Sequence, residues 1–273
     1  MSILQRIKRV IDGKLATINP APIIILGHQK SGTSAIAALL AKATGKTLTL
    51  DFFYKNNQSR PFFRAMLHDG RLPLDSFLRR NSQYLSADII KEPELTYFYD
   101  RLTSTFPSAT YIFVVREPKA TIKSVLDRLS LPGDQPRLTA QQYQQANPLS
   151  GWLPAIEGKA PNVAGENYIE RLAHRWNLAT STYLDHQSQM VLIRYEDFLS
   201  DKLQAIQTLA NKINLAIVDD ISDQLDNQFQ PRGKHHLALS DFFSHQNQVT
   251  IDRICSANAT QFNYCSVSEC PVS

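Results

Sequence analysis

Cysteine is scarce in this sequence, and long hydrophobic runs are absent from it. The three cysteines, Cys255, Cys265 and Cys270, all lie near the C-terminal end. So small and odd a number excludes a disulfide scaffold and favours a reducing compartment. The apolar run at residues 22–26 has only the length of a strand, so we expect neither a transmembrane anchor nor a secretory signal. These absences predict a cytoplasmic protein.

The sequence also lacks a strong excess of charge of either sign. Its 29 lysines and arginines against 25 acidic residues give a net charge of +4, mixed along the chain. This balance argues against a dedicated nucleic-acid binder, although it suits an anionic small ligand. Hydrophobic residues make up 43% of the chain and charged residues 20%, as in ordinary globular proteins. We therefore expect one folded domain over residues 1–273.

The N-terminal segment has the pattern of an amphipathic helix that could contact a membrane. Apolar and basic residues alternate over residues 2–15 with the spacing of an amphipathic helix. Its basic face could make a peripheral membrane contact. The alternative is that the helix packs on its own domain.

Short apolar runs typical of strands alternate along the chain with longer stretches of helical periodicity. This alternation predicts an α/β fold, a three-layer sandwich in which helices flank a central, mainly parallel sheet. The expected strands are 23–26, 47–50, 88–90, 111–115 and 190–193, and the expected helices are 33–43, 95–105, 120–129, 168–186 and 202–213.

Two segments break the periodic pattern. Residues 131–165 are rich in proline, glycine and glutamine, and a loop of this length is usually a functional lid or is disordered. Its Tyr143 and Trp152 could stack on an acceptor or pin the loop to the domain. Residues 259–273 are aperiodic and are expected to form a loose tail. Residues 22–130 are left as the expected nucleotide-binding core.

A glycine-bearing loop joins the first expected strand to the first expected helix. The loop reads GHQKSGTS, from Gly27 to Ser34. A strand, a tight turn and a helix N-terminus gather free N–H groups and the positive end of a helix dipole, which predicts a phosphate site. The nucleotide-hydrolysing loop G-x-x-x-x-G-K-[ST] has a lysine where this chain has Thr33, and the lysine here, Lys30, lies inside the loop. A simple helix cap is the alternative for this loop alone.

A second strand-to-helix junction follows at residues 111–124. The strand ends in Arg116, where a nucleotide hydrolase would place a magnesium-binding aspartate. Pro118 suits the first position of a helix, and Ser124 follows two helical turns beyond Arg116. The arginine fork and the serine hydroxyl predict a second phosphate site. The fold is therefore expected to be of the P-loop type, with a phosphorylated ligand handled by cations and no metal.

The two motifs together resemble the sulfotransferases that use 3'-phosphoadenosine 5'-phosphosulfate (PAPS), in their bacterial and carbohydrate-type branch. In that family the segment P-[KR]-S-G-T-[ST] binds the 5'-phosphosulfate, and the later segment from R-x-P to a serine binds the 3'-phosphate. The resemblance implies PAPS as co-substrate, no metal, and these nucleotide-binding residues: Gln29, Lys30, Ser31, Gly32, Thr33, Ser34, Arg116 and Ser124.

The resemblance extends into the C-terminal half of the chain. The segment 194–198, RYEDF, is similar to the R-Y-E-D-L region of bacterial and carbohydrate sulfotransferases. The basic residues Arg232, Gly233 and Lys234 resemble an element that closes over the 3'-phosphate, and a solvated basic loop is an equal alternative. One departure lies in the loop, where Gln29 replaces the family's usual proline and should loosen the turn.

Sulfonate transfer needs a cation at the leaving oxygen and a base for the acceptor. Lys30 is the natural cation. The Lys-Thr-His run that supplies a histidine base in the cytosolic branch is absent, and two carboxylates at strand ends are the candidates. Asp51 is the first choice and Glu92 the second, each with a helix cap or a solvated turn as its alternative role.

Three further residues near these strand ends are weaker candidates. His28 and His68 are possible bases, although His28 could simply shape the loop. Lys91 could contact the sulfonate or the acceptor, or pair with Glu94.

The predicted function is transfer of a sulfonate from PAPS to a hydroxyl or amine of a carbohydrate, a lipid or a small molecule. Two other classes remain open. A P-loop kinase or NTPase would need magnesium and a metal-binding carboxylate, against which the displaced Lys30 and the position of Arg116 both argue. A non-catalytic nucleotide-binding module would need no acceptor site and no base.

Overall fold

The computed structural model describes residues 17–57, 63–146, 153–160, 163–227, 229 and 237–264. Several expectations lie outside these residues. They concern the amphipathic segment 2–15, Trp152, and the basic residues Arg232, Gly233 and Lys234.

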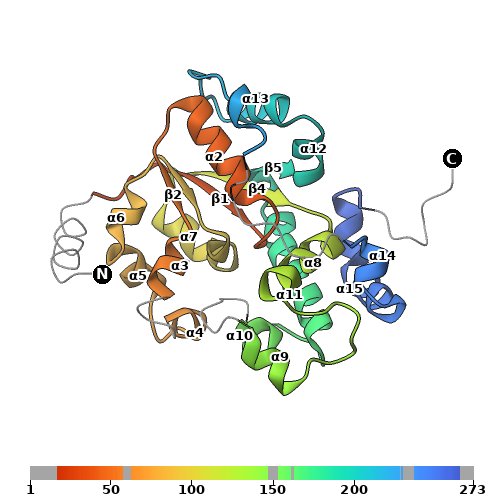
Figure 1. The fold of residues 1–273 in the computed structure, drawn as a ribbon. Helices are drawn as coiled ribbons and strands as arrows, with labels where there is room; N and C mark the ends of the chain where they lie inside the picture. The colour runs from red at the N-terminus through yellow and green to blue at the C-terminus, as the bar shows by residue number, and fades with distance from the viewer. Residues whose placement is uncertain are drawn as a thin grey trace.

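A parallel five-stranded sheet forms the centre of the molecule (Figure 1). Its strands are β1 (Ile23–Gly27), β2 (Leu48–Leu50), β3 (Ile89–Lys91), β4 (Thr110–Val115) and β5 (Met190–Arg194). Their order across the sheet is β2-β3-β1-β4-β5. In the register, Ile24 lies opposite Ile90 on β3 and Tyr111 on β4. The five predicted strands are confirmed to within one or two residues.

Alternation of side chains along β1 divides the core into two layers. Ile24 and Leu26 belong to one buried cluster, and Ile23 and Ile25 belong to the other. Neighbouring residues of a strand point to opposite faces, so a strand that is apolar throughout must be covered on both sides. All five residues of β1 are buried.

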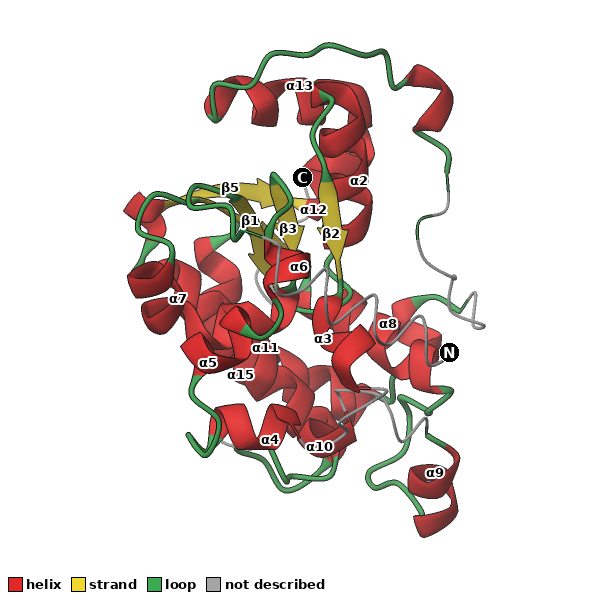
Figure 2. Ribbon diagram, turned by 90° about the vertical axis from the view of Figure 1, so that its left-hand side faces the viewer, coloured by secondary structure: helices red, strands yellow, loops and turns green. Residues whose placement is uncertain are grey.

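Different helices cover the two faces of the sheet (Figures 1 and 2). The helices α2 (Thr33–Thr44), α12 (Tyr195–Ser200) and α13 (Lys202–Lys212) pack on one face. The other face carries α7 (Tyr99–Thr105), α8 (Pro118–Leu129), α11 (Tyr168–Asp185) and α15 (His245–Gln261). The three-layer α/β sandwich predicted from the sequence is therefore confirmed.

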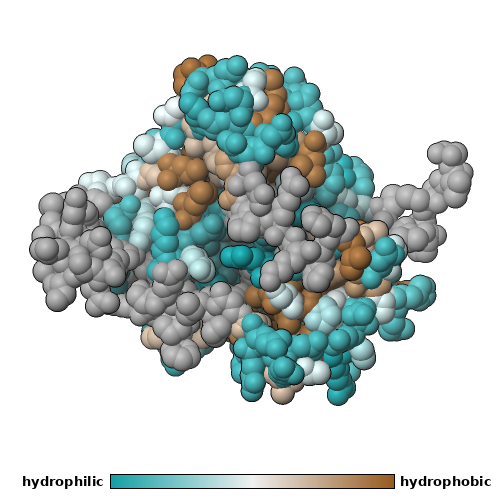
Figure 3. Space-filling view, in the orientation of Figure 1, coloured by the Kyte–Doolittle hydropathy of each residue, from teal (hydrophilic) through white to brown (hydrophobic). Residues whose placement is uncertain are grey.

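Shorter helices complete the described part of the chain. They are α3 (Phe52–Asn57), α4 (Phe63–His68), α5 (Leu74–Arg79), α6 (Ser82–Leu85), η1 (Pro93–Phe98), α9 (Ala140–Gln145), α10 (Leu153–Ile156), η2 (Gln187–Gln189), η3 (Ser222–Gln224) and α14 (Leu239–Phe242). Hydrophobic patches on the face drawn in Figure 3 are separated by hydrophilic surface.

The segment expected to be a lid is partly built into the domain. Its first residues, 131–135, are held by two side chains: the Tyr168 hydroxyl donates to the carbonyls of Pro132 and Gln135, and the Asn247 amide donates to those of Gly133 and Gln135. This anchoring limits any lid to residues beyond Gln135.

The start of the expected tail also differs from the prediction. Helix α15 continues to Gln261, and Phe262 and Tyr264 are buried. The described residues 259–264 thus belong to the packed domain, because Phe262 packs beside Trp176 and Tyr183 and Tyr264 packs on Phe262.

Candidate functional site

The predicted site residues meet at the carboxyl edge of the sheet. Loop 27–32 follows β1, Asp51 follows β2, Glu92 follows β3 and Arg116 follows β4. Because the strands are parallel, their carboxyl ends share one edge, where α/β sheets bind their ligands. The fold thus brings together segments that are far apart in the sequence.

The phosphate loop is built on a tight turn. The Ser31 N–H donates to the His28 carbonyl at 3.2 Å, and Lys30 at the third turn position has a φ of 70°. A positive φ at this position alone is the pattern of a type II turn. Gly27 opens the loop against β4, where a Cβ would lie 2.3 Å from the Val114 carbonyl oxygen. Only glycine allows this close approach.

The loop delivers an open helix N-terminus to the edge of the sheet. Gly32 is the N-cap of α2, none of the described side chains caps this end, and the first turn holds no acidic residue. The Ser31 hydroxyl oxygen is buried and has no hydrogen-bond partner within the described residues. Uncapped N–H groups and a buried hydroxyl without a partner form a site that suits an anion.

Cations surround Lys30. Burial and the positive charges of Arg128, Arg116 and Lys91 together lower its pKa to about 8, against a smaller opposing effect of Asp127. A group of cations is costly without a counter-charge, so the arrangement favours a bound anion. This is the electrostatic setting expected for a phosphate or a phosphosulfate.

Arg116 joins the two predicted anion sites. Its guanidinium donates to the Lys30 carbonyl at 3.1 Å and lies 4.8 Å from the centroid of the Tyr195 ring. Tyr195 in turn packs on Gly32, where a Cβ would lie 2.1 Å from the tyrosine ring. The loop, the end of β4 and the start of α12 therefore form one packed unit.

The backbone around Arg116 is fixed by residues that sequence reasoning gave no role. The Trp176 indole donates to the Arg116 carbonyl at 3.0 Å. Glu196 accepts from the Glu117 N–H at 3.0 Å and from the Tyr264 hydroxyl at 2.6 Å. Only the resemblance of the RYEDF segment pointed toward Glu196. Ser124 lies two turns along α8 and is half-buried.

The two candidate bases differ sharply in their surroundings. The Asp51 carboxylate pairs with Lys91 at 2.6 Å, and its side chain is 37% exposed. Glu92 is only 3% exposed and accepts backbone N–H groups from Phe53 at 2.8 Å and Glu94 at 3.3 Å. Burial, together with the charge of Asp51, raises the pKa of Glu92 to about 7. Glu92 caps η1, whereas Asp51 can be reached from solvent.

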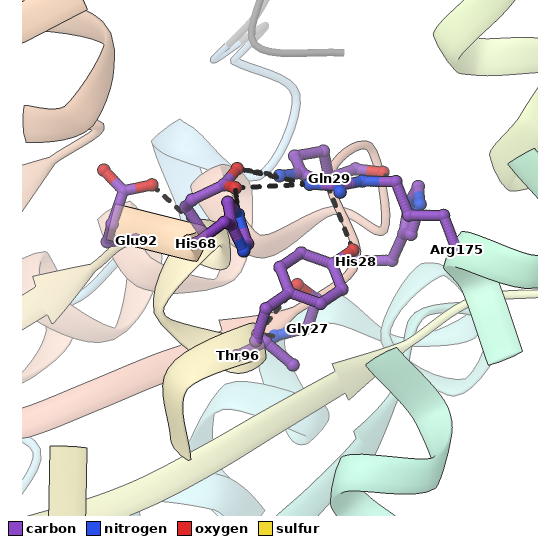
Figure 4. Close-up of polar contacts among 9 residues, drawn as sticks. Gly27, His28, Gln29, His68, Glu92, Thr96 and Arg175 are labelled. Atoms are coloured by element: carbon purple, nitrogen blue, oxygen red, sulfur yellow. Dashed lines mark hydrogen bonds and ion pairs between the residues drawn. The ribbon is translucent and has the colours of Figure 1, made fainter. Parts of the chain in front are cut away.

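A buried polar network lies beneath the loop (Figure 4). The Glu94 carboxylate accepts from the Gln29 amide at 2.9 Å, from His68 at 3.0 Å and from Arg175 at 3.2 Å. Burial would raise the pKa of Glu94, but Arg175 and the His68 hydrogen bond outweigh it and hold that pKa well below its usual range. The alternative pairing of Lys91 with Glu94 is wrong, since Lys91 pairs with Asp51.

The two histidines take part in the packing of this region. Burial lowers the pKa of His28 to about 3, so its imidazole is neutral, and its Nδ1 lies 2.7 Å from the Gln29 carbonyl oxygen. So low a pKa makes His28 a poor base, and it shapes the loop. His68 contacts Glu94 and packs on Phe98 with the ring centroids 4.6 Å apart.

No group of three or more histidine, cysteine, aspartate or glutamate residues in the described part of the chain is arranged to hold a metal ion. Among the same residues, no helix has the length and apolar character to cross a membrane.

Comparisons with known proteins give a fold but no sequence family. The sequence matches no protein-family model and no curated protein. The structure is similar to sulfotransferase STF9 from Mycobacterium avium, with 12% identity, a TM-score of 0.54, and coverage of 95% of this chain and 80% of that one. It is also similar to mouse sulfotransferase SULT7A1 complexed with PAP, with 12% identity, a TM-score of 0.53, and coverage of 96% and 93%.

A third solved structure agrees with these two. The sulfotransferase domain from the curacin biosynthetic pathway is 15% identical, with a TM-score of 0.52, and the match covers 91% of this chain and 99% of that one. The fold defines an α/β protein with a parallel sheet, and the two predicted anion sites lie at the ends of two neighbouring strands. The chain has the sulfotransferase fold.

Proposed function

We propose that the protein is a PAPS-dependent sulfotransferase. It transfers a sulfonate to a hydroxyl or amine of a carbohydrate, lipid or small-molecule acceptor, without a metal. The observation that carries this proposal is the meeting of the uncapped α2 N-terminus with Lys30 and Arg116 at the ends of two adjacent strands. The similarity to a mouse sulfotransferase complexed with PAP supports it.

In this proposal the residues divide between holding the nucleotide and assisting the reaction. The loop Gln29–Ser34 holds the 5'-phosphosulfate, and Arg116 and Ser124 hold the 3'-phosphate, with the segment 232–234 closing over it. The acceptor atom attacks sulfur, and the bond from sulfur to the bridging phosphate oxygen breaks. Its electron pair stays on that oxygen, so 3'-phosphoadenosine 5'-phosphate (PAP) leaves. The Lys30 ammonium stabilises the negative charge that develops there.

Asp51 is the proposed base that takes the acceptor's proton. Its accessible carboxylate can meet an acceptor arriving from solvent, and Lys91 links it electrostatically to Lys30. Both oxygens of Glu92 already accept backbone N–H groups, which suits a structural carboxylate. A base needs a free lone pair within hydrogen-bond reach of the acceptor.

The other classes are less well supported. A kinase or NTPase needs a magnesium-binding carboxylate at the end of β4, where this chain has Arg116. A pure nucleotide-binding module has no use for an accessible carboxylate beside the loop, yet Asp51 lies there. A single-domain protein with a cytoplasmic location completes the proposal, with residues 2–15 either packing on the domain or making a peripheral membrane contact.

The test is a transfer assay with PAPS, in chelator, against a panel of phenol, sugar, alcohol and amine acceptors. The wild type should release PAP and sulfonate at least one acceptor. Asp51→Asn should slow turnover at least about 100-fold, because a positioned base contributes that much. Glu92→Gln should slow it much less, and Asp241→Asn, an exposed control, should leave it unchanged. Magnesium-dependent consumption of ATP with PAPS untouched would overturn the proposal, as would PAP binding with no transfer to any acceptor.

A further inference from the structure

The turn that presents Lys30 has an unusual residue at its second position. Gln29 occupies the position of a type II turn at which proline is favoured, since the proline ring presets the required φ. Without the ring, the unfolded loop has more conformational freedom, and more of that freedom is lost when the turn forms. The turn of this chain therefore needs another restraint.

The Gln29 side chain supplies this restraint through a hydrogen bond to a buried carboxylate. The residue is 8% exposed, and its amide donates to the Glu94 carboxylate at 2.9 Å. The Tyr97 hydroxyl approaches the Gln29 amide oxygen at 3.5 Å. A hydrogen bond to a charged partner in the interior is stronger than one between neutral groups.

The acceptor of this bond is itself fixed. Glu94 and Arg175 are each 3% exposed and form an ion pair at 3.2 Å. The Arg175 guanidinium also lies 4.2 Å from the centroid of the Tyr97 ring, and His68 donates to the second Glu94 oxygen. A buried charge needs partners of this kind, and a partnered one moves little. Glu94 thus joins the loop to η1, α4 and α11.

The same short helix holds the loop at a second point (Figure 4). The Thr96 hydroxyl oxygen accepts from the Gly27 N–H at 2.9 Å and donates to the Gly27 carbonyl at 3.1 Å. Gly27 and Gln29 are therefore both fixed to η1, on either side of His28.

We propose that the Gln29–Glu94–Arg175 network replaces the turn proline as the device that holds the phosphate loop in its binding shape. Gln29, Glu94 and Arg175 are positioning residues that act through the Lys30 backbone. The left-handed conformation of Lys30 is strained, so an unrestrained turn would leave it readily. What the loop binds rests on the function proposed above, but the restraint itself does not.

The test compares Gln29→Ala, which removes the bond, with Gln29→Pro, which restores a restraint through the ring. None of the hydrogen bonds found among the described residues uses the Gln29 N–H, so proline there removes no known donor. Gln204→Ala is the matched control, because the Gln204 side chain donates to Thr208 on the exposed side of α13. Two quantities are measured: hydrogen exchange of the residue 28–34 amides in the free protein, and the affinity for PAP by calorimetry.

Gln29→Ala should raise the exchange rate of the loop amides and weaken PAP binding, each about tenfold, as expected for one hydrogen bond to a charged group. Gln29→Pro should return both to within about threefold of the wild type, since the ring offsets the lost bond. Gln204→Ala should change neither. The melting temperature, measured for each variant, separates local loosening from global loss of stability.

The inference would be overturned if the loop amides of Gln29→Ala exchanged at the wild-type rate. It would also be overturned if those of Gln29→Pro exchanged as fast as those of Gln29→Ala. A wild type that does not bind PAP would instead refute the proposed function. The exchange measurement on the free protein would still decide whether the network holds the loop.

Discussion

At the scale of single residues, Lys30 combines a strained backbone conformation with a lowered side-chain pKa. Its φ of 70° places it in a conformation that side-chain-bearing residues rarely adopt. Its ammonium is largely removed from water and lies among other cations, which lowers its pKa to about 8 through burial, Arg128 and Arg116. Backbone strain and a strongly shifted pKa are typical of functional sites.

This lowered pKa predicts that PAP affinity depends on pH. The phosphates of PAP are ionised above pH 7, and an anion binds the charged form of Lys30 more tightly. Affinity should therefore be level below the pKa of about 8 and fall above it, by roughly tenfold between pH 7 and pH 9.

Calorimetry across this pH range checks the prediction, with Lys30→Ala as the test variant. Its weaker binding should no longer change with pH, whereas Lys42→Ala, at an exposed lysine on α2, should behave as the wild type. A Lys30→Ala variant that keeps the full pH dependence would assign the titration to another group.

Sequence reasoning singled out the loop residues and Arg116 as candidates because they form compact motifs. It could not identify the network around Glu94, because Gln29 lies 65 positions away from Glu94 and Arg175 lies 81. Nor could it distinguish Asp51 from Glu92, since both follow strands. What separates them is burial and the partners of their oxygens, which only the fold determines.

At the scale of elements, the important contact is between the start of α2 and the start of α12. Gly32 ends the phosphate loop with a φ of 90°, and its missing side chain leaves room for the Tyr195 ring. That ring supports Arg116. Glycine is thus required at residue 32 for two separate reasons, conformation and close packing.

Two alanine substitutions separate these reasons. Gly70 has a φ of 79° with nothing within 4 Å of an added Cβ, so Gly70→Ala reports conformational strain alone. We expect Gly70→Ala to cost about 1–2 kcal/mol of stability. Gly32→Ala should cost roughly 1–3 kcal/mol more, because the methyl group must displace Tyr195.

Urea unfolding measures both costs, and calorimetry with PAP measures the effect on the site. PAP binding should be lost in Gly32→Ala and kept in Gly70→Ala. Equal destabilisation by the two substitutions would show that Tyr195 yields easily and does not constrain the loop.

The predicted elements were right where apolar residues repeat with the period of a strand or a helix. The five strands and the helices α2, α8, α11 and α13 were found because their apolar residues repeat along the sequence. The 17-residue helix α15 was not predicted. The helices α3, α4, α5 and α6 were not predicted, since each has only four to six residues. Helices so short have little stability of their own. Tertiary contacts hold them, above all the ring cluster of Phe52, Phe53, Phe63 and Phe77.

At the scale of the whole molecule, the strand order explains where the site lies. From β1 the chain builds β2 and β3 on one side and then β4 and β5 on the other. The crevice at such a reversal is where α/β sheets bind ligands. The two proposed anion sites follow β1 and β4, which are neighbours in the sheet. The sequence predicted the parallel sheet, but not this order, which depends on contacts between distant segments.

The central claim is that the sites after β1 and β4 bind the two ends of one nucleotide. The most direct test is calorimetry in chelator with PAP and with adenosine 5'-monophosphate, which lacks the 3'-phosphate. The wild type should prefer PAP by about 10- to 100-fold, the worth of charge-assisted bonds to one phosphate. Arg116→Ala should lose most of this preference, and Arg101→Ala, at an exposed arginine on α7, should keep it. An unchanged preference in Arg116→Ala, or tighter binding of magnesium ATP than of PAP, would contradict the account.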